Sequence, residues 1–183
     1  MKKILITGGL GFIGSHTTIK LLAKNYDIVL LDNLSNSRIE MIKKISLLAK
    51  KDFKFFNGDI RDRSFLRKIF LKNKIDSVIH FAGLKQVSHS MKYPLEYFEN
   101  NVTGSINLFQ EMSLAGVKSI IFSSSASVYG DTKLVRCTEN APLKPVSVYG
   151  KTKLIVENIL RDIYSSDPNW KIINLRYFNP IGA

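Results

Sequence analysis

Short runs of apolar and β-branched residues alternate along the chain with longer segments in which apolar residues recur at helical spacing. This alternation is typical of parallel strands joined by crossover helices. The expected strands are Lys3–Thr7, Asp27–Asp32, Phe53–Gly58, Asp76–Ala82, Lys118–Ser124 and Lys171–Phe178. The expected helices are Phe12–Lys24, Arg38–Lys50, Arg63–Lys72, a longer one near Leu95–Ala115, and Ser147–Tyr164.

Six such strands complete two mononucleotide-binding halves. The predicted fold is therefore α/β, a doubly wound parallel sheet of Rossmann type with helices on both faces. With 183 residues, 45% of them hydrophobic, the chain can bury one core, so one domain over residues 1–183 is expected. The long irregular stretch Gly130–Val146 predicts a functional loop.

Composition excludes several classes of protein. No apolar run approaches the roughly 20 residues of a membrane span, and the N-terminus lacks a signal-peptide pattern, so a cytoplasmic protein without membrane contact is expected. The only cysteine, Cys137, rules out an internal disulfide and predicts a free thiol, and no metal site is expected. The formal charge is +12, but the lysines are scattered through every element, which argues against a nucleic-acid partner.

A glycine-rich loop lies between the first expected strand and the first expected helix, with Gly8, Gly11 and Gly14 at three-residue spacing. Glycine permits a tight turn and lets backbone N–H groups approach a pyrophosphate at the positive end of a helix. The placement after a strand and before a helix makes this a dinucleotide-binding signal.

Two carboxylates follow the second and third strands. Asp32 ends the second strand, where it can accept hydrogen bonds from an adenosine ribose diol and repel a 2′-phosphate. This favours NAD over NADP, although Arg38 lies near, and the alternative is that Asp32 caps the following turn. Asp59 is expected either to meet the adenine amino group or to cap the helix that begins near Asp62.

Tyr149 and Lys153 lie one helical turn apart, so the ammonium can sit near the phenol, lower its pKa and make it a proton acceptor. A serine run that includes Ser125 leaves the fifth strand at the edge where ligands bind in open α/β sheets. Together these residues form a Ser/Tyr/Lys constellation. His80 and His89 lack the carboxylate spacing of a metal site or a hydrolytic triad.

The chain resembles the extended short-chain dehydrogenase/reductase family, and within it the UDP-glucose (UDP-galactose) 4-epimerases. The resemblance rests on T-G-G-x-G-F-I-G, D-N-L-S-N-S, H-F-A-G-L-K, N-N-V-x-G-S, F-S-S-S-A-S-V-Y-G-D, Y-G-K-T-K and L-R-Y-F-N-P-I-G-A. It implies an NAD-dependent isomerase of galactose metabolism that inverts C4 of a UDP-hexose through a transient 4-keto intermediate.

The same resemblance implies a cofactor pocket. Its residues would be Phe12 and Ile13 at the pyrophosphate, Asp32, Asn33, Leu34, Ser35, Asn36 and Ser37 around the adenosine ribose, and Asp59 and Ile60 at the adenine. Phe81, Ala82, Gly83, Leu84 and Lys85 would follow the ribose and nicotinamide, with Asn100 and Phe178 completing the pocket.

For the reaction, the resemblance implies that Ser125 hydrogen-bonds the sugar 4-hydroxyl and that Tyr149 removes its proton. Lys153 would hold the nicotinamide ribose and depress the pKa of Tyr149. Lys85 and Asn179 would contact the substrate. Dehydration is disfavoured, because 4,6-dehydratases carry an Asp-Glu pair where this chain has Ala126-Ser127. A UDP-uronate 4-epimerase is the nearest alternative enzyme.

Members of the resembled family continue past the last motif into a smaller substrate-binding domain, which is expected to be absent from this chain. Three interpretations follow: a truncated epimerase, half of a split enzyme completed by a separate polypeptide, or a non-catalytic NAD-binding fragment. Because remote binding energy positions the sugar, the chain alone is expected to be slow or inactive. A homodimer through the two longest helices is also expected from the resemblance.

Overall fold

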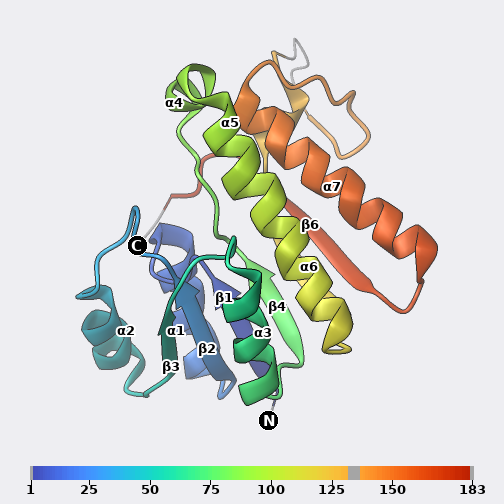
Figure 1. Ribbon diagram of the computed structural model, residues 1–183. Coiled ribbons are helices and arrows are strands. Elements are labelled where there is room, and N and C mark those ends of the chain that lie inside the picture. Colours follow the sequence, from blue (N-terminus) through green and yellow to red (C-terminus); the bar gives the residue numbers. More distant parts are fainter. Residues whose placement is uncertain (1, 132–136, 182–183) are drawn as a thin grey trace.

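Six parallel strands form one sheet in the order β3-β2-β1-β4-β5-β6, in a computed structural model that describes residues 2–131 and 137–181 (Figure 1). The strands are β1 (Lys3–Thr7), β2 (Asp27–Asp32), β3 (Lys54–Asn57), β4 (Ser77–His80), β5 (Ser119–Ser125) and β6 (Lys171–Tyr177). The strand order reverses between β1 and β4, which is where open α/β sheets bind their ligands. The predicted doubly wound fold is confirmed.

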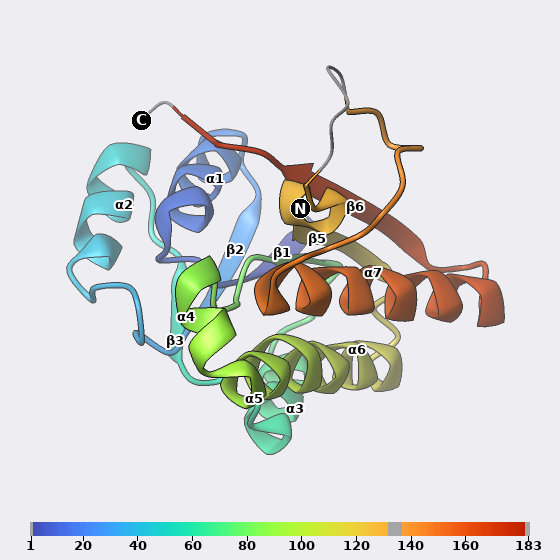
Figure 2. The same ribbon diagram turned by 90° about the horizontal axis from the view of Figure 1, so that it is seen from above.

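Helices cover both faces of the sheet (Figure 2). The α-helices are α1 (Phe12–Ala23), α2 (Met41–Ala49), α3 (Arg63–Lys72), α4 (Val87–Lys92), α5 (Pro94–Tyr97), α6 (Gly104–Leu114) and α7 (Val148–Ser166). A π-helical turn, η1 (Phe98–Thr103), joins α5 to α6, and a 3₁₀ turn, η2 (Ala126–Tyr129), follows β5. Across residues 2–131 and 137–181, no helix has the length and apolar character needed to cross a membrane.

The two faces of the sheet are covered to different extents. Alternate strand residues point to opposite faces. On one face α3, α6 and α7 bury a core that extends from β2 to β5, whereas α1 and α2 on the other face pack over β1, β2 and β4. No described helix covers β6 on that second face, so Ile173 stays 54% exposed and Leu175 38% exposed.

The expected helix near Leu95–Ala115 is the largest difference from the sequence-based prediction. Pro94 begins a short separate helix, and the π-helical turn then interrupts the helical hydrogen-bond pattern before α6. The helix Val87–Lys92 was not expected. The predicted functional loop Gly130–Val146 falls partly outside the described residues, because it includes 132–136. Beyond that gap, Cys137 is a free cysteine that is half-buried against the Val128–Tyr129 cluster.

Candidate functional site

The glycine loop is shaped by two close backbone approaches. Gly8 has a φ of +68°, and a Cβ added there would lie 2.6 Å from the backbone nitrogen of Ala82. A Cβ on Gly14 would lie 2.3 Å from the carbonyl oxygen of Gly8. Gly11 is different, because its added Cβ would meet no atom closer than 3.4 Å. Gly11 therefore faces the open side of the loop, where the sequence predicts a pyrophosphate.

Asp32 joins the glycine loop to the turn after β2. It is buried, and its Oδ2 accepts a hydrogen bond from the Leu10 backbone N–H at 3.0 Å. Its Oδ1 accepts from the Leu34 N–H at 3.0 Å and from the Ser37 hydroxyl at 2.7 Å. The turn-capping role is therefore present in the structure. Oδ2 keeps acceptor capacity, because a carboxylate oxygen can take more than one donor.

The ends of β2 and β3 are joined through Asp59. Its carboxylate accepts from the Asn33 side chain at 2.9 Å and forms an ion pair with Arg61 at 2.8 Å. The Arg61 hydrogen bonds lower the pKa of Asp59 to about 2. The helix-capping alternative for Asp59 is wrong, because Asp62 caps α3 by accepting from the Phe65 N–H at 3.0 Å. Arg61 lies in none of the recognised sequence motifs, so it was not predicted as a site residue.

The loop after β4 lies between the glycine loop and α7. The Phe81 N–H donates to the Thr7 carbonyl at 2.9 Å, and the Leu84 N–H donates to Asn101 Oδ1 at 2.8 Å. A Cβ on Gly83 would lie 3.5 Å from the Lys153 ammonium. This segment therefore brings the predicted phosphate loop and the predicted catalytic helix together at one edge of the sheet.

His80 sits at the centre of a buried chain of hydrogen bonds. Its Nδ1 lies 2.6 Å from Thr7 Oγ1 and its Nε2 lies 2.9 Å from Ser105 Oγ, which in turn donates to the Asn101 carbonyl. The ring is fully buried, and this burial, with a smaller contribution from Lys153, lowers the pKa of His80 to about 3. His80 therefore stays neutral at physiological pH and ties β1 and β4 to α6 and, through Ser105, to η1.

Ser125, Tyr149 and Lys153 come together where β5 meets α7. Ser147 caps α7 by accepting from the Gly150 N–H at 3.0 Å. Lys153 is 5% exposed, and its ammonium donates to the Ser123 carbonyl at 2.8 Å and lies 5.9 Å from the centre of the Tyr149 ring. The structure thus brings these three predicted residues together at this end of the sheet.

The predicted lowering of the Tyr149 pKa is not found in this structure. Burial raises the pKa of Tyr149, and hydrogen bonding by Ser125 opposes that shift only in part. Lys153 is turned toward the Ser123 carbonyl and is itself buried, which lowers its own pKa to about 8. Lys153 keeps most of its positive charge at pH 7, but its charge does not offset the burial of the phenol.

The remaining predicted residues differ in how closely they join the site. Asn100 is buried and donates to Asn101 Oδ1 at 2.9 Å, whereas Lys85 is exposed on the loop after β4. Phe178 is 62% exposed and stacks on Tyr129, with ring centres 6.2 Å apart. Asn179, also exposed, makes no side-chain hydrogen bond within residues 2–131 and 137–181.

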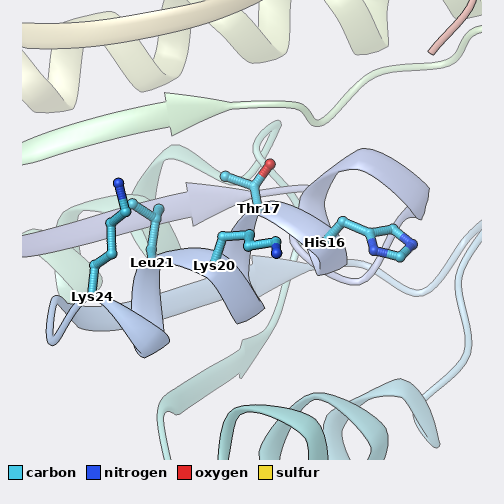
Figure 3. A pocket seen from close by; sticks show the side chains of 5 residues that line it. All are labelled: His16, Thr17, Lys20, Leu21 and Lys24. Atoms are coloured by element: carbon cyan, nitrogen blue, oxygen red, sulfur yellow. The ribbon is translucent and has the colours of Figure 1, made fainter. Parts of the chain in front are cut away.

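Other features of the described residues lie away from this edge. Figure 3 shows a hollow along α1 that is lined by His16, Thr17, Lys20, Leu21 and Lys24, none of which is a predicted site residue. The exposed Phe12 ring meets His16 edge-on at 5.1 Å. Residues 2–131 and 137–181 contain no cluster of three His, Cys, Asp or Glu side chains suited to a metal ion.

Comparison with known proteins gives the family. A sequence model described as GDP-mannose 4,6 dehydratase matches residues 5–183. The chain belongs to this family. Within the dehydratase family, it is 55% identical over 184 residues to the UDP-glucose 4-epimerase of Neisseria meningitidis serogroup A, with 100% of this chain and 54% of that protein covered. The predicted resemblance to the UDP-glucose 4-epimerases is confirmed.

Solved structures of related epimerases have the same fold. The UDP-glucose 4-epimerase from Bifidobacterium longum, in complex with NAD⁺ and UDP, gives a TM-score of 0.97 at 45% identity, with 100% of this chain and 55% of that chain covered. The enzyme from Stenotrophomonas maltophila, with bound NAD and formylated UDP-arabinopyranose, also gives 0.97, at 40% identity and with 100% and 55% covered. This family member therefore spans about half the length of the relatives that it matches.

Sequence reasoning missed a second buried cluster in this member of the dehydratase family. Glu157 on α7 is 1% exposed and forms an ion pair with Arg176 of β6 at 2.7 Å. The Arg176 guanidinium also donates to the Tyr129 hydroxyl at 3.0 Å. The available signal was the eight-residue spacing between Tyr149 and Glu157, which places both side chains on one face of a helix.

Proposed function

We propose that this family member binds NAD and supplies the catalytic groups for epimerisation at C4 of a UDP-hexose. The observation that carries the proposal is the grouping of Ser125, Tyr149 and Lys153 at the sheet edge that also holds the glycine loop. Solved relatives with 40–45% identity contain NAD, and one of them contains UDP. The same chemistry in this chain is the simplest account of its likeness to these relatives.

The residues of the glycine loop fit a dinucleotide. Gly11 leaves the open side of the loop free of side-chain atoms, and Asp32 can add ribose hydroxyl donors to its backbone partners. A carboxylate at this position repels a 2′-phosphate, which favours NAD over NADP. When bound, NAD supplies the redox chemistry, because nicotinamide accepts a hydride from an alcohol carbon and can return it.

The side chains of this protein would handle the proton. Ser125 would hydrogen-bond the 4-hydroxyl of the sugar, and Tyr149 in its phenolate form would take the hydroxyl proton, with bound NAD supplying the acceptor for the C4 hydride. The resulting 4-keto sugar presents its other face, regains the hydride at C4 and regains the proton from Tyr149, so no net oxidation occurs. Because burial raises the pKa of Tyr149, nearby positive charge is needed to make it a base, and Lys153 supplies one such charge.

Epimerisation is favoured over the dehydration that names the family. Loss of water from a 4-keto sugar needs an acid and a base near C5 and C6. The two residues after Ser125 are Ala126 and Ser127, in the 3₁₀ turn η2, and neither side chain can act as a carboxylic acid or base. A UDP-uronate 4-epimerase needs the same groups and differs in substrate, so it remains the second candidate.

We further propose that residues 1–183 act as the NAD-binding domain and that efficient turnover needs the kind of substrate-binding residues found in the other half of the relatives. The alternatives are a split enzyme completed by another polypeptide and a non-catalytic NAD-binding protein. A homodimer would use α6 and α7, which lie side by side in both ribbon views (Figures 1 and 2). The cytoplasmic location stays a prediction.

The test measures bound cofactor and its reduction. We expect the purified protein to carry NAD(H), detected by mass spectrometry, and to show slow growth of NADH absorbance when UDP-glucose or UDP-galactose is added. Tyr149→Phe should slow this growth by about 100-fold or more without loss of NAD. Tyr164→Phe is the matched control, because Tyr164 is 51% exposed near the other end of α7.

The outcomes separate the candidates. Absence of NAD binding would refute the proposed function altogether. NAD binding with no reduction by any UDP-hexose would leave the non-catalytic binder. Rapid reduction by UDP-glucuronate alone would favour the uronate epimerase.

A further inference from the structure

Three consecutive serines at the end of β5 contact three residues on one stripe of α7. Ser123 accepts a hydrogen bond from Lys153 at its backbone carbonyl, at 2.8 Å. The Ser124 hydroxyl donates to the Glu157 carboxylate, and the side chain of Ser125, the next residue, acts to lower the pKa of Tyr149 by hydrogen bonding. The three α7 residues are spaced four apart, so they form a single row on the helix surface.

Glu157 is the most buried residue of this row. Its carboxylate is 1% exposed and accepts three hydrogen bonds from the Arg176 guanidinium, at 2.7 to 3.2 Å. Arg176 also donates to Tyr129 in η2 and to the Glu139 carbonyl at 3.1 Å. One buried carboxylate thereby connects β5, α7, β6 and the segment after β5.

The Ser124 hydroxyl is the direct link between this ion pair and the catalytic strand end. Ser124 is 2% exposed and precedes Ser125 in the chain. Ser125 then caps η2, where its Oγ accepts from the Ser127 N–H at 3.2 Å and donates to Ser127 Oγ at 3.2 Å. A displacement of Ser124 would therefore shift the point at which the chain leaves the strand, and with it the Ser125 hydroxyl. Distances between catalytic groups have large effects on rate, so this link has a functional consequence.

We propose that Glu157 is a positioning residue that acts through Ser124 to hold the Ser125 hydroxyl against Tyr149. This inference rests on the proposed function, in which Ser125 and Tyr149 act on the sugar 4-hydroxyl. The role is distinct from general stabilisation of the fold, because it predicts a change at one named phenol when a carboxylate two helical turns away is altered.

The test follows the ionisation of Tyr149 in the full chain, labelled with ¹³C at the tyrosine ring carbon that bears oxygen. The Tyr149 resonance is assigned by its loss in Tyr149→Phe. Glu157→Gln and Ser124→Ala should each raise the pKa of Tyr149 further, because they weaken the Ser125 hydrogen bond that lowers it. Ser125→Ala should give the same shift, and adding Glu157→Gln to it should give no further shift.

Glu111→Gln is the matched control. Glu111 is also a buried carboxylate, 2% exposed, held by Arg63 at 2.6 Å and Arg67 at 3.0 Å, but it lies between α3 and α6. Ser123→Ala is a second control, because Ser123 uses its backbone carbonyl and not its side chain in the contact with Lys153. Both variants should leave the Tyr149 titration unchanged.

The result that overturns the inference is an unchanged Tyr149 titration in folded Glu157→Gln and Ser124→Ala, or an equal shift in Glu111→Gln. Glu157→Gln removes the counter-charge of Arg176. If that variant does not fold, the Tyr149 titration in Ser124→Ala decides between the outcomes. The titration needs neither NAD nor turnover, so failure of the proposed function leaves this test intact. Where UDP-sugar-dependent NADH formation is present, Ser124→Ala should slow it about tenfold with NAD content unchanged.

Discussion

The two halves of the sheet edge hold their polar residues in different ways. At the ends of β1 and β2, Asp32 binds Leu34 and Ser37, which lie two and five residues along the chain. At the end of β5, the contacts to Lys153 and Glu157 join residues 30 and 33 positions apart. In the first half, Asp32 is held mainly by backbone N–H groups, including that of Leu10 in the glycine loop, whereas in the second half the buried Lys153 and Glu157 side chains make the contacts to β5. The second half should therefore respond to pH, and the first to added side-chain volume.

Acid should give the largest effect, at the buried His80 that joins the two halves. Its pKa is about 3 in the folded protein and 6.5 when exposed, so between these values the unfolded state binds more protons and stability falls as pH falls. From pH 6.5 to pH 3 the unfolding free energy should fall by about 4 to 5 kcal/mol from this group. Urea unfolding from pH 7 to pH 4 should show this loss in the native chain and a smaller loss in His80→Gln. An equal loss of stability in the native chain and in His80→Gln would contradict the role of His80. His16→Gln is the control, because His16 is exposed.

Alkali should give the next effect, at Lys153. Its pKa is about 8 in the folded protein and 10.5 when exposed, so its protonated form costs stability below pH 8 and this cost disappears as pH rises to 10.5. The unfolding free energy should gain about 3 kcal/mol over that window from this group. Lys153→Met should lack the gain, whereas exposed Lys151→Met should keep it. The measurement is urea unfolding at pH 7.5 and pH 10.

Added volume should distinguish two glycines of the first half. Gly14→Ala should lower the unfolding free energy by about 2 kcal/mol, because its methyl group meets the Gly8 carbonyl at 2.3 Å. Gly11→Ala should change stability by less than about 0.5 kcal/mol but abolish NAD retention, because its methyl group points to the open side of the loop. Normal NAD content in Gly11→Ala would place the cofactor elsewhere.

The smallest stability effect concerns the exposed face of β6. Ile173 is 54% exposed on the face of β6 that no described helix covers, and exposed apolar strand surface favours association. Ile173→Lys should reduce concentration-dependent self-association in sedimentation runs while changing stability by less than about 0.5 kcal/mol. Ile39→Lys, at a residue 46% exposed before α2, is the matched control. Identical sedimentation of all three proteins would show that this face is inert.

The same contrast explains what the sequence could predict. Strand positions, the glycine loop and the Tyr149–Lys153 pair follow from short-range periodicity, and β1, β2 and α3 begin and end at the predicted residues. The cap at Asp62 is also a local pattern, because its partner Phe65 lies three residues on, although the prediction offered Asp59 for this role. Such features involve residues within one or two helical turns, where spacing alone determines proximity.

The residues that escaped prediction depend on tertiary burial. Glu157 and Arg176 resemble solvated charges in the sequence, and only the packing of α7 against β5 and β6 buries them. The upward shift of the Tyr149 pKa was missed for the same reason, because periodicity does not report how far water is excluded from a phenol. Helix α4 was missed because Val87–Lys92 is too short to show a helical period.

The π-helical turn η1 fixes the rotation of α6 about its axis relative to α5. Within that turn, the Asn101 amide accepts from the Leu84 N–H and donates to the Leu84 carbonyl and to Thr152, and four residues later Ser105 meets His80. Removing one residue from Phe98–Thr103 would rotate the downstream helix by about 100° relative to the upstream part. A single deletion would therefore break the hydrogen bonds by which Asn101 joins the loop after β4 to the start of α7. Every side chain named in the mechanism would still be present.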